Sequence, residues 1–518
     1  MLTIMVGSRN TLRGFWLALA LTGMCLIGCA PDVLLISPAA RRTIDRSVVE
    51  YPAGYRLQTI VRELTGPTAI TFDKEGSLIV ADRGLSDTPH IFGFKPDGSR
   101  FEIWPDPKRL PFNLGATRRQ IRGPIGGMVA AYGSIYIYHR DARGRGVISS
   151  LDYNGRSATV VADLPCEGEN GVLDLVLNSY DGRLYFAVGS MTNSGVVGLD
   201  NWDEGWVGAY GSVCDRPAGR YRLLGYRFDT PNPRAGWFMG SDIAVTAPFQ
   251  AFGRSSQMWV TPAENGKPTA AVYSVAVTGG DLRLEAHGIR CGKGLAFNEF
   301  GRLYATDQGM ELRGTRPVKE DPDTLLRIVK NTWYGWPDYS ADLRPITERQ
   351  FQPPVELIIK TGYPELSFLL DHQASGLIPP DRDTLLQTTF APMAGASKMA
   401  FAPSMGPMKD LNGSAVIALF GDRAPFATSD LPVGDPQGYK VVQVDVDNHR
   451  WRDLIYNTRR GPGSRHGGNP DALERPFDVK FGPDGAMYIL DMGQVRMAGG
   501  ELDPATRTGK ILRLDVGK

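Results

Sequence analysis

One hairpin pattern recurs along the chain and limits the folds open to it. In each copy a Gly or Pro opens the segment, apolar residues alternate, a glycine-bearing turn follows, and a second apolar strand ends in polar residues. In the first copy Ile70 and Phe72, then Leu78 and Val80, alternate with a period of two and so present one face to a core. Gly76 supplies the positive φ that the turn needs. The copies occupy residues 66–84, 123–141, 170–190, 292–309 and 475–493, with a longer-turned sixth copy in residues 395–423.

Six such hairpins predict an all-β fold, a six-bladed β-propeller with long loop insertions. No single hairpin can bury its own apolar face, whereas radial stacking buries all of them. A β-sandwich with six similar hairpins is the alternative. One blade needs about 40 to 45 residues, so the uneven spacing of the copies implies large insertions, the longest between Gly189 and Gly288. Insertions of this kind gather on one face, where they commonly build or cover a site.

The composition agrees with this fold and excludes one class of partner. The 61 Gly and 37 Pro residues predict many turns and short strands. The 57 basic and 56 acidic residues nearly balance, which gives no indication of a nucleic-acid surface.

The N-terminus predicts export and lipid anchoring. Arg9 and Arg13 precede a short apolar run, residues 15–27, and Gly28-Cys29 follows it. Such a run is typical of a secretory signal rather than a membrane span, and the small residue before Cys29 fits a bacterial lipoprotein processing site. An ordinary cleaved signal or an uncleaved anchor is the alternative. We expect a signal peptide with a lipobox in residues 1–29, lipidation at Cys29, a tether in residues 30–55 and the propeller in residues 56–518. The protein would face the periplasm or the exterior of a bacterial cell envelope and touch the membrane through its lipid alone.

Two further cysteines leave a question open. Cys166 and Cys214 both lie in loop-like sequence, so in an oxidising compartment they could form a disulfide. Two unpaired thiols are the alternative, because separation in sequence does not fix distance in space.

Polar residues end the second strand of each hairpin. If the copies superpose, these residues meet on one face and form a binding site for a polar or anionic ligand. The alternative is that they cap strand ends and turns, which is the better interpretation for the aspartates. The residues are Asp82, Arg83, His139, Arg140, Asp141, Ser190, Asp307, Gln308, Asp422, Arg423 and Asp491.

Three segments resemble the glucose/sorbosone dehydrogenase family. They are GIRCGKGLAFNEFGRLYATDQG (288–309), DPDTLLRIVKNTWYGWPDY (321–339) and RPFDVKFGPDGAMYILD (475–491), in that order. The resemblance runs from about Gly66 to the C-terminus. It implies a six-bladed propeller that oxidises a sugar or polyol with pyrroloquinoline quinone (PQQ) and calcium.

The resemblance assigns roles to particular residues. Arg290 matches an arginine that contacts the anionic groups of the quinone, and a planar guanidinium suits carboxylates. Gln308 and Gly309, with Met310 beside them, match the segment whose carbonyl oxygens approach calcium. Arg475 matches the first of two basic residues over the cofactor.

The same comparison shows where this chain departs from the family. Cys291 stands in place of an asparagine, and Lys293, a further cofactor contact here, stands where glutamine is frequent. Phe477 replaces the second cofactor arginine, and Arg423 only approximately replaces a lysine. Asn170 stands at or next to the position of the histidine that serves as general base, and its amide cannot accept a proton near neutral pH.

Another histidine would have to serve as the base. His139, at a strand end on the expected ligand face, is the best replacement, followed by His466 and His372. A structural role is the alternative for each of them. No CxxCH haem attachment occurs, so electrons would pass to an external acceptor.

Three functions are compatible with these observations. The first is an exported, lipid-anchored PQQ- and calcium-dependent sugar or polyol dehydrogenase. The second is a non-catalytic propeller that binds a glycan or a cell-envelope protein. The third is a calcium-dependent lactonase-type hydrolase, which the arginines at the strand ends disfavour because they repel a metal ion.

Overall fold

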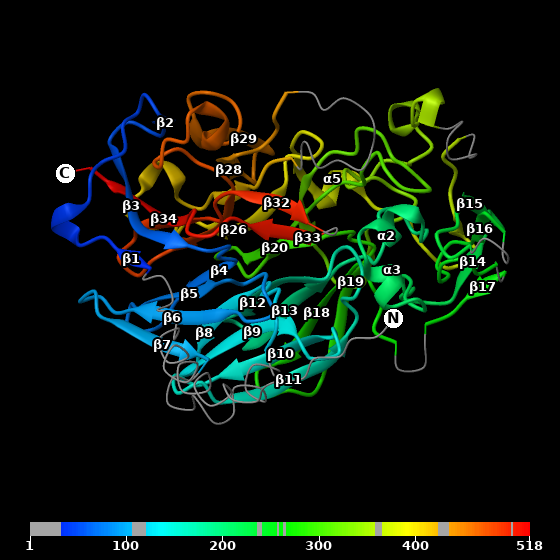
Figure 1. The fold of residues 1–518 in the computed structure, drawn as a ribbon, viewed down its shortest axis with the longest axis horizontal. Coiled ribbons are helices and arrows are strands. Elements are labelled where there is room, and N and C mark those ends of the chain that lie inside the picture. The colour runs from blue at the N-terminus through cyan, green and yellow to red at the C-terminus, as the bar shows by residue number, and fades with distance from the viewer. Residues whose placement is uncertain are drawn as a thin grey trace, which may run out of the picture.

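The computed structural model describes residues 33–105, 121–235, 241–255, 258–262, 266–357, 365–422, 435–498 and 501–517. This part of the chain is rich in strands and has few helices, as an all-β protein should (Figure 1). Its strands form six antiparallel sheets of four or five strands and three smaller sheets.

The first three large sheets follow the chain order. Sheet 1 contains β4 (Ala69–Phe72), β5 (Leu78–Asp82), β6 (His90–Phe94) and β7 (Arg100–Trp104). Sheet 2 contains β8 (Met128–Ala131), β9 (Ser134–Arg140), β10 (Gly146–Leu151) and β11 (Ser157–Leu164). Sheet 3 contains β12 (Val172–Asn178), β13 (Arg183–Val188), β18 (Ala271–Ala276) and β19 (Arg283–His287), with the short β23 (Thr332–Trp333) parallel to β19.

The other three large sheets follow, and sheets 5 and 6 also take strands from the N-terminal segment. Sheet 4 contains β20 (Gly292–Phe297), β21 (Leu303–Asp307), β22 (Thr324–Ile328) and β25 (Leu386–Thr389). Sheet 5 contains β26 (Ala396–Phe401), β27 (Ala415–Leu419), β28 (Lys440–Asp445), β29 (Arg450–Asn457) and β2 (Val49–Glu50). Sheet 6 contains β30 (Pro476–Phe481), β31 (Met487–Asp491), β34 (Gly509–Val516), β3 (Tyr55–Leu64) and β1 (Leu34–Leu35).

Each predicted hairpin forms the two neighbouring strands at one edge of a large sheet, and the strand at that edge is called the first strand of the sheet. The hairpins are β4–β5, β8–β9, β12–β13, β20–β21, β26–β27 and β30–β31. Their turns have the expected chemistry at the two positions that most require glycine. Gly76, between β4 and β5, has φ +83°, and Gly485, between β30 and β31, has φ +74°. A side chain at either position would strain the left-handed backbone.

Neighbouring sheets share their cores. The first strands contact one another in the order β4, β8, β12, β20, β26 and β30, and β30 in turn contacts β4. Within β5, Leu78 and Val80 pack against sheet 6, whereas Ile79 and Ala81 pack against sheet 2. The hairpins therefore bury both faces rather than the single face that their alternation predicts, because each sheet lies between two others.

The N-terminal segment completes the last sheet. β3 pairs with β34, and Figure 1 shows these strands, blue and red, side by side. From Val33 onwards the expected tether is folded: β1 pairs with β3 and β2 with β29, and Ile44, Val49 and Tyr51 are buried. Apolar residues of this segment therefore pack against sheets 5 and 6.

The long insertions carry the smaller sheets and most of the helices. The small strands are β14 (Tyr221–Leu223), β15 (Phe228–Pro231), β16 (Ile243–Thr246), β17 (Trp259–Val260), β24 (Leu370–Asp371), β32 (Val495–Ala498) and β33 (Glu501–Pro504). The α-helices are α2 (Leu199–Asp203), α3 (Trp206–Ala209) and α5 (Arg382–Leu385), and 3₁₀ turns cover Pro38–Ala40, Arg349–Phe351, Lys409–Leu411 and Gly463–His466. None of the helices in the described ranges is long and apolar enough to cross a membrane.

The cysteines in the described ranges are all free thiols. Cys166 is buried, and its thiol lies 3.2 Å from the carbonyl oxygen of Gly144, to which it donates. Of the two alternatives left open for Cys166 and Cys214, the structure therefore has the unpaired one.

Candidate functional site

The aspartates that end the second strands bind backbone groups. The carboxylate of Asp307 accepts hydrogen bonds from the N–H groups of Arg290 (3.1 Å) and Cys291 (2.6 Å). Asp491 accepts from the N–H of Arg475 at 2.8 Å in the same way. Burial raises the pKa of Asp307 to about 7, and the hydrogen bond from Cys291 opposes that rise. Asp307 and Asp491 thus hold the segments that enter sheets 4 and 6, and the capping interpretation applies to them.

Some of the residues to which the family resemblance gives cofactor or calcium roles line one cavity, whereas Arg290 and Arg475 do not line it. A cavity of about 60 Å³ is lined by Lys293, Gln308, Gly309 and Phe477, among others. Met310 is not among the lining residues and is buried in the apolar core of the insertions. Cofactor pockets usually enclose about 300 to 1,000 Å³, so this cavity is much smaller than a tricyclic quinone requires.

Arg290 has no hydrogen-bond donor left for a ligand. Its Nε donates to the carbonyl oxygen of Asn193 at 3.1 Å, and its Nη1 donates to those of Gln308 (3.3 Å) and Gly309 (3.0 Å). Its Nη2 donates to the carboxylate of Glu169 and to Oδ1 of Asn193 at 3.1 Å. A guanidinium has five N–H donors, and this side chain, 3% exposed, makes five contacts.

This arrangement also bears on calcium. The carbonyl oxygens of Gln308 and Gly309, which the resemblance assigns to the metal, accept from the positively charged guanidinium of Arg290. A second cation at the same oxygens would be repelled. The described residues contain no group of three or more His, Cys, Asp or Glu side chains placed for a metal ion. In this conformation the donors of Arg290 and the two carbonyl oxygens, which the resemblance assigns to PQQ and calcium, bind one another or other groups of the protein.

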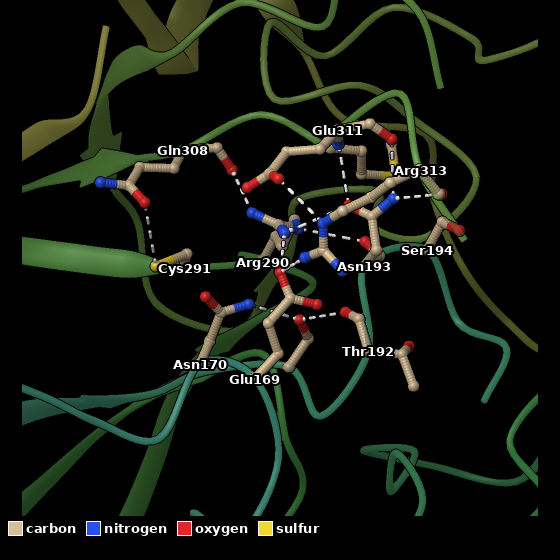
Figure 2. A network of polar contacts seen from close by, with 12 residues as sticks. Glu169, Asn170, Thr192, Asn193, Ser194, Arg290, Cys291, Gln308, Glu311 and Arg313 are labelled. Atoms are coloured by element: carbon tan, nitrogen blue, oxygen red, sulfur yellow. Dashed lines mark hydrogen bonds and ion pairs between the residues drawn. The ribbon is translucent and has the colours of Figure 1, made fainter. Parts of the chain in front are cut away.

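A buried charge network surrounds Arg290. Figure 2 shows Glu169 between Arg290 and Arg313, with its carboxylate paired to both guanidinium groups. Arg313 also pairs with Asp200 at 3.0 Å and with Glu311 at 2.8 Å. The side chain of Glu169 is 2% exposed, and its Oε2 has no hydrogen-bond partner in the described part of the chain.

Few features of the sequence indicate this network. Glu169 directly precedes Asn170, the position at which a histidine was sought, and Arg313 lies four residues after Gly309. Their pairing joins segments far apart in the chain, which no spacing rule predicts. Asn170 is itself buried and donates from Nδ2 to Oγ of Ser190 at 3.0 Å.

Arg475 is held by the protein as well. Its Nη1 donates to the carbonyl oxygens of Phe420, Gly421 and Asp422, the last at 2.8 Å. Its guanidinium lies 4.7 Å from the ring centre of Phe420 and 5.0 Å from that of Tyr439, a cation–π arrangement. Burial lowers the pKa of Arg475. Arg423 and Cys29, for which the sequence predicts a cofactor contact and lipidation, lie outside the described residues.

The candidate base His139 is enclosed. It is 1% exposed, its Nδ1 lies 2.8 Å from the carbonyl oxygen of Arg140, and its Nε2 lies 2.9 Å from Oγ of Ser149. Burial lowers the pKa of His139 to about 4. His372 contacts the carboxylate of Asp338 at 2.9 Å. Both ring nitrogens of His139 are engaged within the protein, so it has no access to a substrate in this conformation.

The depressed pKa of His139 predicts a pH-dependent stability. The pKa of His139 is about 4 in the folded chain and near 6.5 in the unfolded chain. As the pH falls, the unfolded chain therefore binds this proton before the folded chain does. Stability from this group is complete above pH 6.5 and is lost as the pH falls toward 4. We expect the stability advantage of the wild type over His139→Gln to shrink by about 2 kcal/mol between pH 7 and pH 5. Urea unfolding at both values measures this, with the exposed His466→Gln as a control. Equal changes in all three proteins would contradict the prediction.

A larger cleft lies beside the small cavity. It encloses about 900 Å³ and is lined by Arg83 and Arg140, two of the predicted strand-end residues, and by Arg122. Leu502 of β33 lines both hollows. The expectation that strand-end residues gather at one place therefore holds for these arginines.

Together these features describe an antiparallel-sheet protein with a buried charge network beside an arginine-lined cleft. No protein-family model matches the sequence, and no curated protein matches it. By structure, the chain is similar to the Trichoderma reesei Carbohydrate-Active Enzymes Family AA12 protein, with 15% identity over 91% of this chain and 98% of that one and a TM-score of 0.50. This likeness shows a shared fold.

Other solved structures match over nearly the same span. The holo form of the pyranose dehydrogenase PQQ domain from Coprinopsis cinerea is 12% identical over 91% of this chain and 98% of that one, with a TM-score of 0.49. The PQQ-bound aldose sugar dehydrogenase of Streptomyces coelicolor is 14% identical over 90% and 100%, with a TM-score of 0.43.

Proposed function

We propose that the six large sheets are the blades of a closed six-bladed β-propeller, and that this propeller binds a sugar, polyol or glycan without quinone chemistry. The contact between the first strands of sheets 6 and 1, and the strand that β3 adds to sheet 6, support closure. The fold shared with the AA12 protein supports a carbohydrate ligand. A fold alone does not establish an activity, so the function has to be inferred from the residues of the site.

The state of Arg290 is the observation that carries this proposal. A quinone with carboxylates needs donors directed at it, but all five donors of Arg290 are used by the protein. Releasing the guanidinium would leave Glu169 buried beside fewer positive charges, which is costly. The amide of Asn170 cannot replace the missing base.

The test exposes the purified full chain to calcium and PQQ and measures thermal stability together with dye reduction over a panel of sugars and polyols. We expect neither a cofactor-dependent rise in the unfolding temperature nor turnover, while a glycan panel identifies a bound saccharide. Dye reduction that needs PQQ would overturn the proposal, and Arg290→Ala would then test whether this arginine holds the cofactor.

A second candidate is the PQQ- and calcium-dependent oxidation of a sugar or polyol, with an external electron acceptor. The convergence of Lys293, Gln308 and Gly309 on one cavity supports it. It requires a conformation in which Arg290 leaves its present partners. The cofactor experiment distinguishes the two candidates, and no observation favours a calcium-dependent lactonase.

The location of the protein belongs to the same proposal. The signal-like N-terminus and Cys29 support export and lipid anchoring in a bacterial cell envelope, facing the periplasm or the exterior. We expect the protein to fractionate with membranes and Cys29→Ala to appear in the soluble extracytoplasmic fraction. Membrane association that is unchanged in Cys29→Ala would contradict the lipid anchor.

A further inference from the structure

The large cleft is built around three arginines on adjoining segments. Arg83 follows β5 and Arg140 ends β9. Arg122 and Arg140 pair through their backbones, with the N–H of each donating to the carbonyl oxygen of the other at 3.0 Å. The segment after Arg83 joins them, because the N–H of Gly123 donates to the carbonyl oxygen of Ser86 at 2.9 Å. Backbone hydrogen bonds thus fix the three arginines relative to one another.

The three guanidinium groups have no carboxylate partner in the described part of the chain. Two acidic residues at the cleft pair elsewhere, Asp141 with Arg143 at 3.1 Å and Asp503 with Arg496 at 2.8 Å. A third, Asp87, is exposed. Positively charged groups that converge on a cleft and have no carboxylate partner raise the local concentration of anions and favour their binding.

Two details show that the arginines are held in place at some cost. The Nη2 of Arg140 donates to the carbonyl oxygen of Cys166 at 2.9 Å, while its Nε is buried without a hydrogen-bond partner among the described residues. Arg83 has φ +49°, a left-handed conformation that glycine would adopt more easily. Strained backbone of this kind is concentrated at ligand sites.

The rest of the lining suits a saccharide. Hydroxyl groups come from Thr65, Ser86, Thr88 and Thr506, and they can exchange hydrogen bonds with sugar hydroxyls. Tyr210, just after α3 in the long insertion, adds an aromatic ring with a polar end. The volume of about 900 Å³ is near the upper end of the usual range for ligand pockets, so it accommodates more than one sugar ring.

We propose that this cleft binds an anionic saccharide, one that carries carboxylate or phosphate groups, and that Arg83 and Arg122 contact those groups. The proposal rests on the proposed saccharide-binding function and names its ligand class. A guanidinium donates two parallel hydrogen bonds to either anion, which makes arginine the appropriate side chain. No redox step or cofactor is involved.

The experiment titrates the purified full chain by calorimetry with three probes of similar size. They are an oligosaccharide of uronic acids, its neutral counterpart, and the neutral oligosaccharide with a phosphate group. We expect an anionic probe to bind at least about tenfold more tightly than the neutral one, and its affinity to fall as salt is raised. Whichever anionic probe binds more tightly identifies the source of the charge.

Variants assign the binding to the cleft. Arg83→Gln with Arg122→Gln should weaken the anionic probe about tenfold or more, and Arg83→Lys, which keeps the charge but loses the fork, should have a smaller effect. Arg450→Gln, an exposed arginine away from the cleft, is the matched control, and circular dichroism verifies folding of each variant. Equal affinity for neutral and anionic probes, or unchanged affinity in the double variant, would overturn the proposal. PQQ-dependent turnover would instead overturn the proposed function and leave this cleft assignment intact.

Discussion

Glu169→Gln should lower the free energy of unfolding by roughly 3 to 5 kcal/mol, because it leaves two buried guanidinium groups short of a negative charge. Glu169 pairs with Arg290 and Arg313, and its side chain is 2% exposed. The glutamine could still accept with its oxygen at the position of Oε1, where both arginines bind, but it would carry no negative charge. Urea unfolding followed by tryptophan fluorescence measures the difference.

The control for this prediction is Glu299→Gln. Glu299 is exposed in the turn between β20 and β21, and its side chain forms no ion pair with any described residue. We expect its replacement to change stability by less than about 0.5 kcal/mol, as for most surface substitutions. A loss below about 1 kcal/mol in Glu169→Gln would show that water or a rearranged partner satisfies the two arginines.

The hairpins were predictable because they are local. The alternation of Ile70 with Phe72 and of Leu78 with Val80, and the glycine turn between them, are determined within one short segment. The outer strands were not predictable to the same degree. β3 finds β34 at the opposite end of the chain, and such a pairing leaves no periodic signal in either segment.

For the candidate site, the sequence predicted that certain residues lie near one another but not which groups they contact. Lys293 lies near Gln308 and Gly309 because they belong to one hairpin, in which Gly292 pairs with Asp307. The hairpin pattern could not show that Arg290 faces Glu169, because that contact depends on how the segment before β12 packs against the segment before β20. The resemblance assigned Arg290 to a ligand, whereas the structure gives its donors to the protein. The motif therefore predicted the place of Arg290 in the fold better than it predicted the groups that Arg290 binds.

The second large effect is expected at Lys398, near the middle of the molecule. Its Nζ donates to the carbonyl oxygen of Thr68 at 2.7 Å and lies 3.7 Å from the carboxylates of Asp174 and Asp478. These contacts link the first strands of sheets 3, 5 and 6 and the segment that enters sheet 1. Because the side chain is 2% exposed, Lys398→Met should lower the free energy of unfolding by roughly 3 to 5 kcal/mol.

A second substitution distinguishes lost charge balance from lost packing. Asp174 also accepts from the N–H of Leu295 at 3.0 Å, so it stays buried when the lysine is removed. Adding Asp174→Asn to Lys398→Met removes one uncompensated charge and should recover part of the lost stability, while Lys409→Met, at an exposed lysine, should have little effect. If the double variant is less stable than Lys398→Met by the full cost of Asp174→Asn alone, the two residues are not coupled, and the lysine stabilises the centre through its packing.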